Sequence, residues 1–325
     1  MVAAAAFALA VVLPAGARAA SGQAVERWKA VEVAQPENKA DEAVLGRPIA
    51  LVIDKDRLYI ADAVDCAVKV FSTDGRFVRS FGRKGKGPGE LTFPSGVCVA
   101  GNAIAVADKL NFRIEVFDRE GRASGGFKLA FAPDRIFALG ADRLLVTGNP
   151  TGRQKGERLL HIFDMTGRVI WEGLEARASS DPVFDAFRNM ILVCPGEKDD
   201  FFVVYRSGER AIAHFTVSGA LLEAIVVDER LPFKPLDMPS GKGTMRLLGF
   251  CWAAAADDGF LYLSVPETVG GRDLGPGRTL SVIDGQGRLR AEVGLACAVH
   301  RFLVADGRVF AIDDEGALRI FEVVR

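Results

Sequence analysis

The sequence lacks closely spaced cysteines. Its five, Cys66, Cys98, Cys194, Cys251 and Cys297, are spread along 325 residues with no CxxC pair. Zinc and haem motifs bring their ligands together over short intervals, so this spacing supplies neither. The odd number leaves at least one thiol free in a monomer. All but Cys66 lie among apolar residues where buried strands are expected, and there cysteine usually acts as a small hydrophobe. We therefore expect buried thiols rather than a disulfide framework.

Net charge is also nearly absent, at −1 from 41 basic and 42 acidic residues. A chain without excess charge has no global attraction to nucleic acid or to anionic membranes. We therefore expect no nucleic-acid partner and only local electrostatic binding. Long helix-periodic stretches are missing too, whereas 35 glycines and 49% hydrophobic residues fit a globular β protein.

What the chain does contain is a short phrase that returns six times. Each copy is an alternating apolar strand, and all but the last run into a turn closed by glycine. The copies are VKVFSTDG (68–75), IEVFDREG (114–121), LHIFDMTG (160–167), IAHFTVSG (212–219), LSVIDGQG (280–287) and LRIFEVVR (318–325). Their starts lie 46, 46, 52, 68 and 38 residues apart. Repeats of this length built from short strands predict an all-β fold, a six-bladed β-propeller.

Each blade can be divided into four strands, which are lettered A to D outward from the axis of the ring. The first blade is expected to have strands at 48–54, 57–63, 68–72 and 76–82, and the second at 96–101, 103–108, 113–118 and 122–129. The sixth blade runs out of chain after its third strand, whereas ERWKAVEV (26–33) has no blade of its own. We expect this N-terminal strand to complete the last blade and close the ring, because closure leaves no unpaired edge at the seam. Residues 20–47 are then the closing strand and linker, and residues 48–325 the propeller.

The N-terminus reads as a signal peptide over residues 1–19. An uncharged apolar run at 2–13 is followed by Pro14 and Gly16 and by the small-x-small triplet Ala17-Arg18-Ala19. The run is too short for a comfortable transmembrane helix, and no cysteine follows it for lipid attachment. We expect a periplasmic or secreted protein with no stable membrane insertion after cleavage.

Two segments give the chain a family resemblance. VADKLNFRIEVFDREG (106–121) resembles the NHL repeat, and IADAVDCAVKVFSTDG (60–75) is a looser copy. The later blades keep the strand spacing but lose the phrase. The resemblance implies an NHL-like six-bladed propeller with a central channel, of the type common in exported bacterial proteins. It implies no single activity, because such rings serve as protein-binding platforms or RNA binders and, in related propellers, as lactonases and lyases.

Related lactonase-type propellers hold a divalent cation such as calcium with Glu, Asn and Asp at the starts of inner strands. Only two oxygen ligands, Asp134 and Asn189, occupy such positions in this sequence, which is too few. Asp62 and Asp108 repeat at B-strand ends and are interpreted as turn-forming residues. We therefore predict no metal or other cofactor, and a metal-dependent hydrolase or lyase remains the alternative function.

Histidine is scarce as well. His161 and His214 fall in C strands one position out of phase, so their side chains point to opposite faces of their blades. His300 precedes an inner strand and is the one histidine expected near the channel. No serine or cysteine is marked as its nucleophilic partner, so the sequence predicts no catalytic residue.

Arginines, in contrast, recur near the expected starts of inner strands, where side chains rim the channel. They are Arg47, Arg135, Arg188, Arg246 and Arg301. Guanidinium groups gathered around a concave mouth suit a carboxylate, phosphate or sulfate group. The alternative is that they pair with nearby acids such as Asp134 and Glu197.

Irregular loops on one rim of a propeller often form its binding face. The connector at 82–96 carries Arg83, Lys84 and Lys86, the segment 226–244 carries Phe233 as an exposed anchor, and a long polar loop spans 266–278. The sequence thus predicts an exported, non-enzymatic binding or scaffold module. Its partner would be a protein, a peptide or a small anionic ligand, held at the channel mouth and the rim loops.

Overall fold

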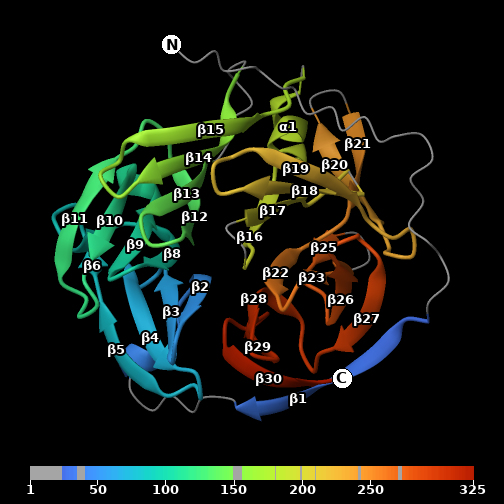
Figure 1. Ribbon diagram of the computed structural model, residues 1–325, viewed down its shortest axis with the longest axis horizontal. Coiled ribbons are helices and arrows are strands. Elements are labelled where there is room, and N and C mark those ends of the chain that lie inside the picture. The colour runs from blue at the N-terminus through green and yellow to red at the C-terminus, as the bar shows by residue number, and fades with distance from the viewer. Residues whose placement is uncertain are drawn as a thin grey trace.

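The computed structural model is a ring of six blades around a central axis (Figure 1). It describes residues 24–34, 41–148, 156–179, 181–197, 200–208, 210–240, 243–269 and 273–325. The expected signal peptide at 1–19 lies outside these residues. Within them, no helix is long and apolar enough to cross a membrane.

Each blade is a four-stranded antiparallel unit whose first strand lies nearest the axis. Blade 1 contains β2 (Pro48–Asp54), β3 (Arg57–Asp62), β4 (Ala67–Ser72) and β5 (Phe77–Phe81). Blade 2 contains β8 (Pro94–Ala100), β9 (Ala103–Asp108), β10 (Arg113–Phe117) and β11 (Ala123–Lys128). Blade 3 contains β12 (Pro133–Leu139), β13 (Arg143–Gly148), β14 (Arg158–Asp164) and β15 (Val169–Glu175).

The second half of the ring follows the same order. Blade 4 contains β16 (Ile191–Pro195), β17 (Asp200–Tyr205), β18 (Ala211–Thr216) and β19 (Leu221–Val226). Blade 5 contains β22 (Ala253–Asp257), β23 (Phe260–Ser264), β26 (Thr279–Asp284) and β27 (Leu289–Gly294). Blade 6 contains β28 (Val299–Ala305), β29 (Arg308–Asp313), β30 (Leu318–Val324) and the N-terminal strand β1 (Glu26–Ala34).

The hydrophobic core lies between neighbouring blades rather than at one centre. Strand β9 is buried along almost its whole length, because its alternate side chains pack against different neighbours. Val106 joins a cluster with Val68 of blade 1, whereas Ala107 joins a cluster with Val146 of blade 3. Similar clusters lie between the other neighbouring pairs of blades. Burial on both faces explains why each blade needs the next.

The repeated phrase ends in a tight turn, as its sequence predicts. In five blades the glycine that closes the phrase has a positive φ and donates its N–H to the carbonyl of the residue three positions earlier. These glycines are Gly75, Gly121, Gly167, Gly219 and Gly287. A side chain other than hydrogen would be strained in that conformation, so the glycine sets the direction of the outer strand.

The N-terminal strand closes the ring, which confirms the prediction. β1 pairs antiparallel with β30 from Lys29 to Ala34, with a bulge near its end. It also pairs in parallel with β27 of blade 5 over four residues, Glu26 to Lys29, a contact that the sequence did not predict. Trp28 is buried on β1 and meets Phe260 edge to face, with ring centroids 6.2 Å apart.

Inserted elements account for the two long intervals between phrases. Helix α1 (Pro182–Arg188) lies between blades 3 and 4, and Asp181 caps it by accepting the N–H groups of Val183 and Phe184 at 3.1 Å. A hairpin of β20 (Lys234–Ser240) and β21 (Gly243–Gly249) connects blades 4 and 5. A smaller hairpin, β24 (Glu267–Val269) and β25 (Asp273–Gly275), lies within blade 5. The segments expected as irregular loops therefore contain ordered strands.

Candidate functional site

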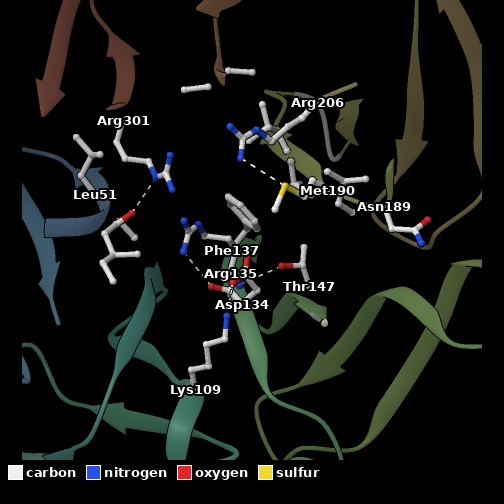
Figure 2. A pocket seen from close by; sticks show the side chains of 18 of the residues that line it. Leu51, Lys109, Asp134, Arg135, Phe137, Thr147, Asn189, Met190, Arg206 and Arg301 are labelled. Carbon is white, nitrogen blue, oxygen red and sulfur yellow. Dashed lines mark hydrogen bonds and ion pairs between the residues drawn. The ribbon is translucent and has the colours of Figure 1, made fainter. Parts of the chain in front are cut away.

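The inner strands enclose a cavity of about 380 Å³ at one mouth of the channel. Residues of β2, β12, β16, β22 and β28 contribute to its wall. It opens on the side of the ring where the connections between blades and the turns between B and C strands emerge, since Lys109 follows a B strand and Ala186 lies in α1. Figure 2 shows Arg135, Arg206 and Arg301 pointing toward the middle of this pocket.

Arg135 and Arg301 hold equivalent places in blades 3 and 6. Each follows a bulge at the start of its inner strand, where the ladder shifts by one residue. The guanidinium of Arg135 donates to the carbonyl of Ser95 in blade 2 at 2.6 Å, and that of Arg301 donates to the carbonyl of Ile49 in blade 1 at 3.2 Å. β-Bulges redirect side chains, and here they aim two cations into the channel mouth.

Two other inner strands with a bulge, β2 and β8, carry small residues at the same place. Ala50 of blade 1 and Gly96 of blade 2 follow bulges of the same kind. A Cβ on Gly96 would lie 2.8 Å from the backbone nitrogen of Ile136 and 3.2 Å from the Cα of Arg135. The missing side chain therefore lets blade 2 approach the backbone that carries Arg135.

Arg206 is the third cation of the pocket and comes directly after β17. Its guanidinium lies over the Trp252 ring, 4.5 Å from the centroid, and one nitrogen is 3.7 Å from the sulfur of Met190. Stacking on an aromatic face is an ordinary way to hold an arginine side chain in place while its nitrogens remain available.

These three arginines are not held by direct ion pairs with other described residues. Across the described residues, no carboxylate forms an ion pair with Arg135, Arg206 or Arg301, although many other arginines of the chain are paired, for example Arg319 with Asp313 at 2.8 Å. Asp134 lies in the same pocket, but it pairs with Lys109 at 2.8 Å. The three side chains are partly buried, and the one acid beside them among the described residues of the pocket, Asp134, is shared with Lys109. The pocket therefore has an excess of positive charge that an anion would balance.

The electrostatics of the pocket agree with this geometry. Burial and then the charges of Arg135 and Arg206 lower the pKa of Arg301 to about 9. Burial also lowers the pKa of Arg206, and Arg135 adds to that effect. Burial opposes the ionisation of Asp134, but the charges of Arg135 and Lys109 outweigh it and lower its pKa. The pocket is therefore strongly positive at neutral pH.

Replacing Arg301 should stabilise the anion-free protein. The pKa of Arg301 is lower in the fold, at about 9, than its ordinary value of 12.5, so its charge opposes folding fully below pH 9 and less as the pH rises above 9. We expect Arg301→Gln to raise the free energy of unfolding at pH 7 by about 1–3 kcal/mol, and by less at pH 10. Urea denaturation at both pH values measures this, and a variant that is less stable at pH 7 would make Arg301 a structural cation.

The other predicted arginines do not line this pocket, although Arg47 lines the outer part of the mouth together with Arg135 and Arg301. There its guanidinium is 5.8 Å from the centroid of the Phe93 ring. Arg188 is the last residue of α1 and pairs with Asp185 at 3.0 Å. Arg246 was placed at an inner strand, which is wrong. It lies on β21, is 67% exposed and pairs with Asp237 at 2.7 Å, because an inserted hairpin precedes the true inner strand β22.

The predicted rim residues do not line the pocket. Arg83 and Lys84 make the short strand β6, which pairs with β7 (Glu90–Leu91), and Arg83 bonds Glu90 at 3.0 Å. Lys86 is exposed on the same connector. Phe233 is not the exposed anchor that was expected. It stacks on Phe250, with centroids 5.0 Å apart, and is partly buried.

The aspartates at B-strand ends are structural, as predicted. In blade 1, Asp62 accepts the N–H groups of Gly46 and Arg47 at 2.7 and 2.9 Å. In blade 2, Asp108 accepts those of Thr92 and Phe93, which precede β8, at 2.9 and 3.1 Å. They fix the chain where it enters an inner strand.

The residues present do not fit the metal site of the alternative function. Asn189 uses its side-chain oxygen and nitrogen to bond the backbone of Arg177, both at 2.8 Å, and Asp134 is held by Lys109. No group of three His, Cys, Asp or Glu side chains that could hold a metal ion occurs in the part of the chain that the structure describes. His161 and His214 bond Glu172 and Asp200 at 2.8 Å, within blades 3 and 4.

Sequence reasoning missed Arg206 and Lys109. Both come directly after a B strand, β17 and β9 respectively, and such ends meet the same mouth as the starts of the inner strands. Cations just after B strands, considered together with those at the starts of inner strands, would have indicated both residues.

The protein is a six-bladed β-propeller. Residues 39–187 match the model of a family described as a 6-bladed β-propeller, DUF5128. A segment of 57 residues is 44% identical to the RING finger protein nhl-1 of Caenorhabditis elegans. It covers 16% of this chain and 6% of that protein, so the NHL likeness is confined to a short stretch.

Solved structures resemble the whole ring. A candidate exported protein of Bacteroides fragilis has a TM-score of 0.63 at 11% identity, covering 92% of this chain and 95% of that one. A member of the duf4221 family from Bacteroides vulgatus has a TM-score of 0.63 at 10% identity, covering 92% and 98%. A streptogramin B lyase has a TM-score of 0.51 at 15% identity, covering 84% and 78%. At these identities the likeness concerns the fold alone.

Proposed function

We propose that this propeller is a non-enzymatic binding module for a small anionic ligand, held at the channel mouth by Arg135, Arg206 and Arg301. One observation carries the proposal, namely that three inward-pointing arginines share one pocket without a carboxylate partner among the described residues. A second class of function, metal-dependent hydrolysis or elimination, has no comparable support.

We also propose that the protein works in the periplasm or outside the cell, on the strength of its N-terminal sequence.

The cations are arranged for a ligand that accepts several hydrogen bonds. Nη1 of Arg135 donates to the carbonyls of both Ser95 and Asp134, at 2.6 and 3.1 Å. Arg301 uses Nε for the carbonyl of Ile49 at 3.2 Å and Nη1 for that of His300 at 2.8 Å. A guanidinium has five N–H donors, so donors remain on each side chain for a carboxylate, phosphate or sulfate oxygen. Because backbone carbonyls hold both groups, the site is largely preformed.

Calorimetric titration with acetate, sulfate and phosphate at constant ionic strength tests the proposal. We expect at least one of these anions to bind the purified protein with a 1:1 stoichiometry. Arg206→Gln should weaken that binding about tenfold, because a hydrogen bond to a charged group contributes about 1.5 kcal/mol or more. Calorimetry is preferred to thermal melting, since sulfate and phosphate stabilise most proteins without binding to a site.

Arg246→Gln is the matched control. It removes one arginine of an exposed ion pair on β21, outside the pocket, and should leave the affinity unchanged. Equal affinities of the unaltered protein and of Arg206→Gln would overturn the proposal, and so would the absence of binding by all three anions.

A further inference from the structure

Below the arginines, the lining of the channel changes from partly polar to apolar. A second cavity of about 360 Å³ continues along the axis, and it shares seven lining residues with the pocket at the mouth. These shared residues are Ala50, Leu51, Arg135, Phe137, Val193, Ala254 and Phe302. The two cavities are therefore consecutive parts of one channel.

The wall of this lower cavity is apolar. Among the described residues that line it, Arg135 at the top is the one with a charged side chain, and the others are aliphatic, aromatic, proline or cysteine. On β2 the lining runs from Ile49 at the mouth to Ile53 in the lower cavity. At about 3.3 Å per residue, these four steps follow the channel for roughly 13 Å. The acids of the mouth, Asp134 among them, do not reach this depth.

We infer that the ligand is an amphipathic anion, with its charged head on the three arginines and an unbranched hydrocarbon tail in the lower cavity. This inference rests on the proposed function of the mouth. A positive pocket above an apolar channel complements a molecule with those two parts, and the two cavities are in the size range of small-molecule sites, about 300–1,000 Å³. A fully polar anion such as phosphate would contact the arginines and leave the lower cavity unused.

A chain-length series tests the tail. Calorimetric titration compares butyrate, hexanoate, octanoate and decanoate, all below their micelle concentrations, with matched alkyl sulfates and with octanol. We expect the dissociation constant to fall about fourfold for each methylene that enters the channel, because burying one methylene contributes about 0.8 kcal/mol. Octanol, which lacks the charge, should bind at least about 100-fold more weakly than octanoate.

Two substitutions obstruct the lower cavity. Ala138→Phe and Ala256→Phe place a ring in its wall from blades 3 and 5, and neither residue lines the pocket at the mouth. Both variants should bind butyrate like the unaltered protein and lose the gain in affinity from hexanoate to decanoate. Two variants from different blades are used because one of them could fail to fold, which a thermal melt detects.

The possible results distinguish binding of the hydrocarbon tail from binding of the charged head group. An affinity that stays flat with chain length while Arg206→Gln still weakens butyrate binding would overturn the tail and leave the anion site standing, with the lower cavity filled by water. No binding of butyrate, alkyl sulfate or sulfate would overturn both.

Discussion

Deleting residues 20–35 is expected to lower the unfolding midpoint by more than about 10 °C. The deletion removes β1, which completes blade 6 and also bridges to blade 5 through its parallel pairing with β27. Strands β30 and β27 would then have unpaired edges, which favour aggregation as well as instability. Differential scanning calorimetry of both chains checks this, and equal melting temperatures would contradict the closure of the ring by β1.

A single substitution isolates the anchor of that strand. Trp28 is 8% exposed and packs on Phe260, while the Arg325 guanidinium lies 4.9 Å from the centre of its ring. Trp28→Ala should reduce the free energy of unfolding by about 3–4 kcal/mol through the loss of this packing. Val31→Thr on the same strand is the control, because Val31 is 51% exposed and its replacement should change stability by less than about 0.5 kcal/mol.

The double variant Arg135→Gln/Arg301→Gln should bind anions at least about 100-fold more weakly, because each lost charge-assisted hydrogen bond contributes about 1.5–3 kcal/mol. The amide nitrogen of glutamine lies where Nε of arginine does, so at position 301 it can still donate to the carbonyl of Ile49. At position 135 it is too short for the carbonyl of Ser95, which Arg135 reaches with Nη1. Calorimetric titration with the tightest anion of the series measures the loss.

Lysine at the same two positions distinguishes charge from geometry. Arg135→Lys/Arg301→Lys keeps both positive charges but lacks the planar fork of donors, so it should recover only part of the affinity. Full recovery would mean that the pocket acts by charge alone. Unchanged affinity of the glutamine variant would place the anion elsewhere on the molecule.

The fold follows from the sequence because each blade repeats the same local signals. The glycine that ends five of the six phrases, such as Gly121, adopts a positive φ. In the strands between the turns, apolar residues are buried on both faces of the blade. Counting strands along the sequence showed that blade 6 lacks its outer strand and that the strand around Trp28 belongs to no other blade. Local propensity and global closure thus point to one answer.

The site follows only in part, because its geometry depends on irregular features. Arg135 and Arg301 were predicted from their place near inner strands, but the bulges that aim them were not, although the bulge before Arg135 begins at Pro133. Arg246 was misplaced because the inserted hairpin of β20 and β21 precedes the inner strand β22. Arg206 was not predicted, because channel cations were expected only at the starts of inner strands and Arg206 follows the B strand β17. Whether two cations share a pocket depends on how blades distant in sequence pack together.

The most direct measurement is a crystal structure of the protein with sodium selenate, whose selenium atom can be located by anomalous scattering. The account predicts an anomalous peak at the channel mouth, with selenate oxygens in hydrogen-bond distance of Arg135, Arg206 and Arg301. Peaks confined to the outer surface of the ring, with the mouth empty of selenium, would contradict it.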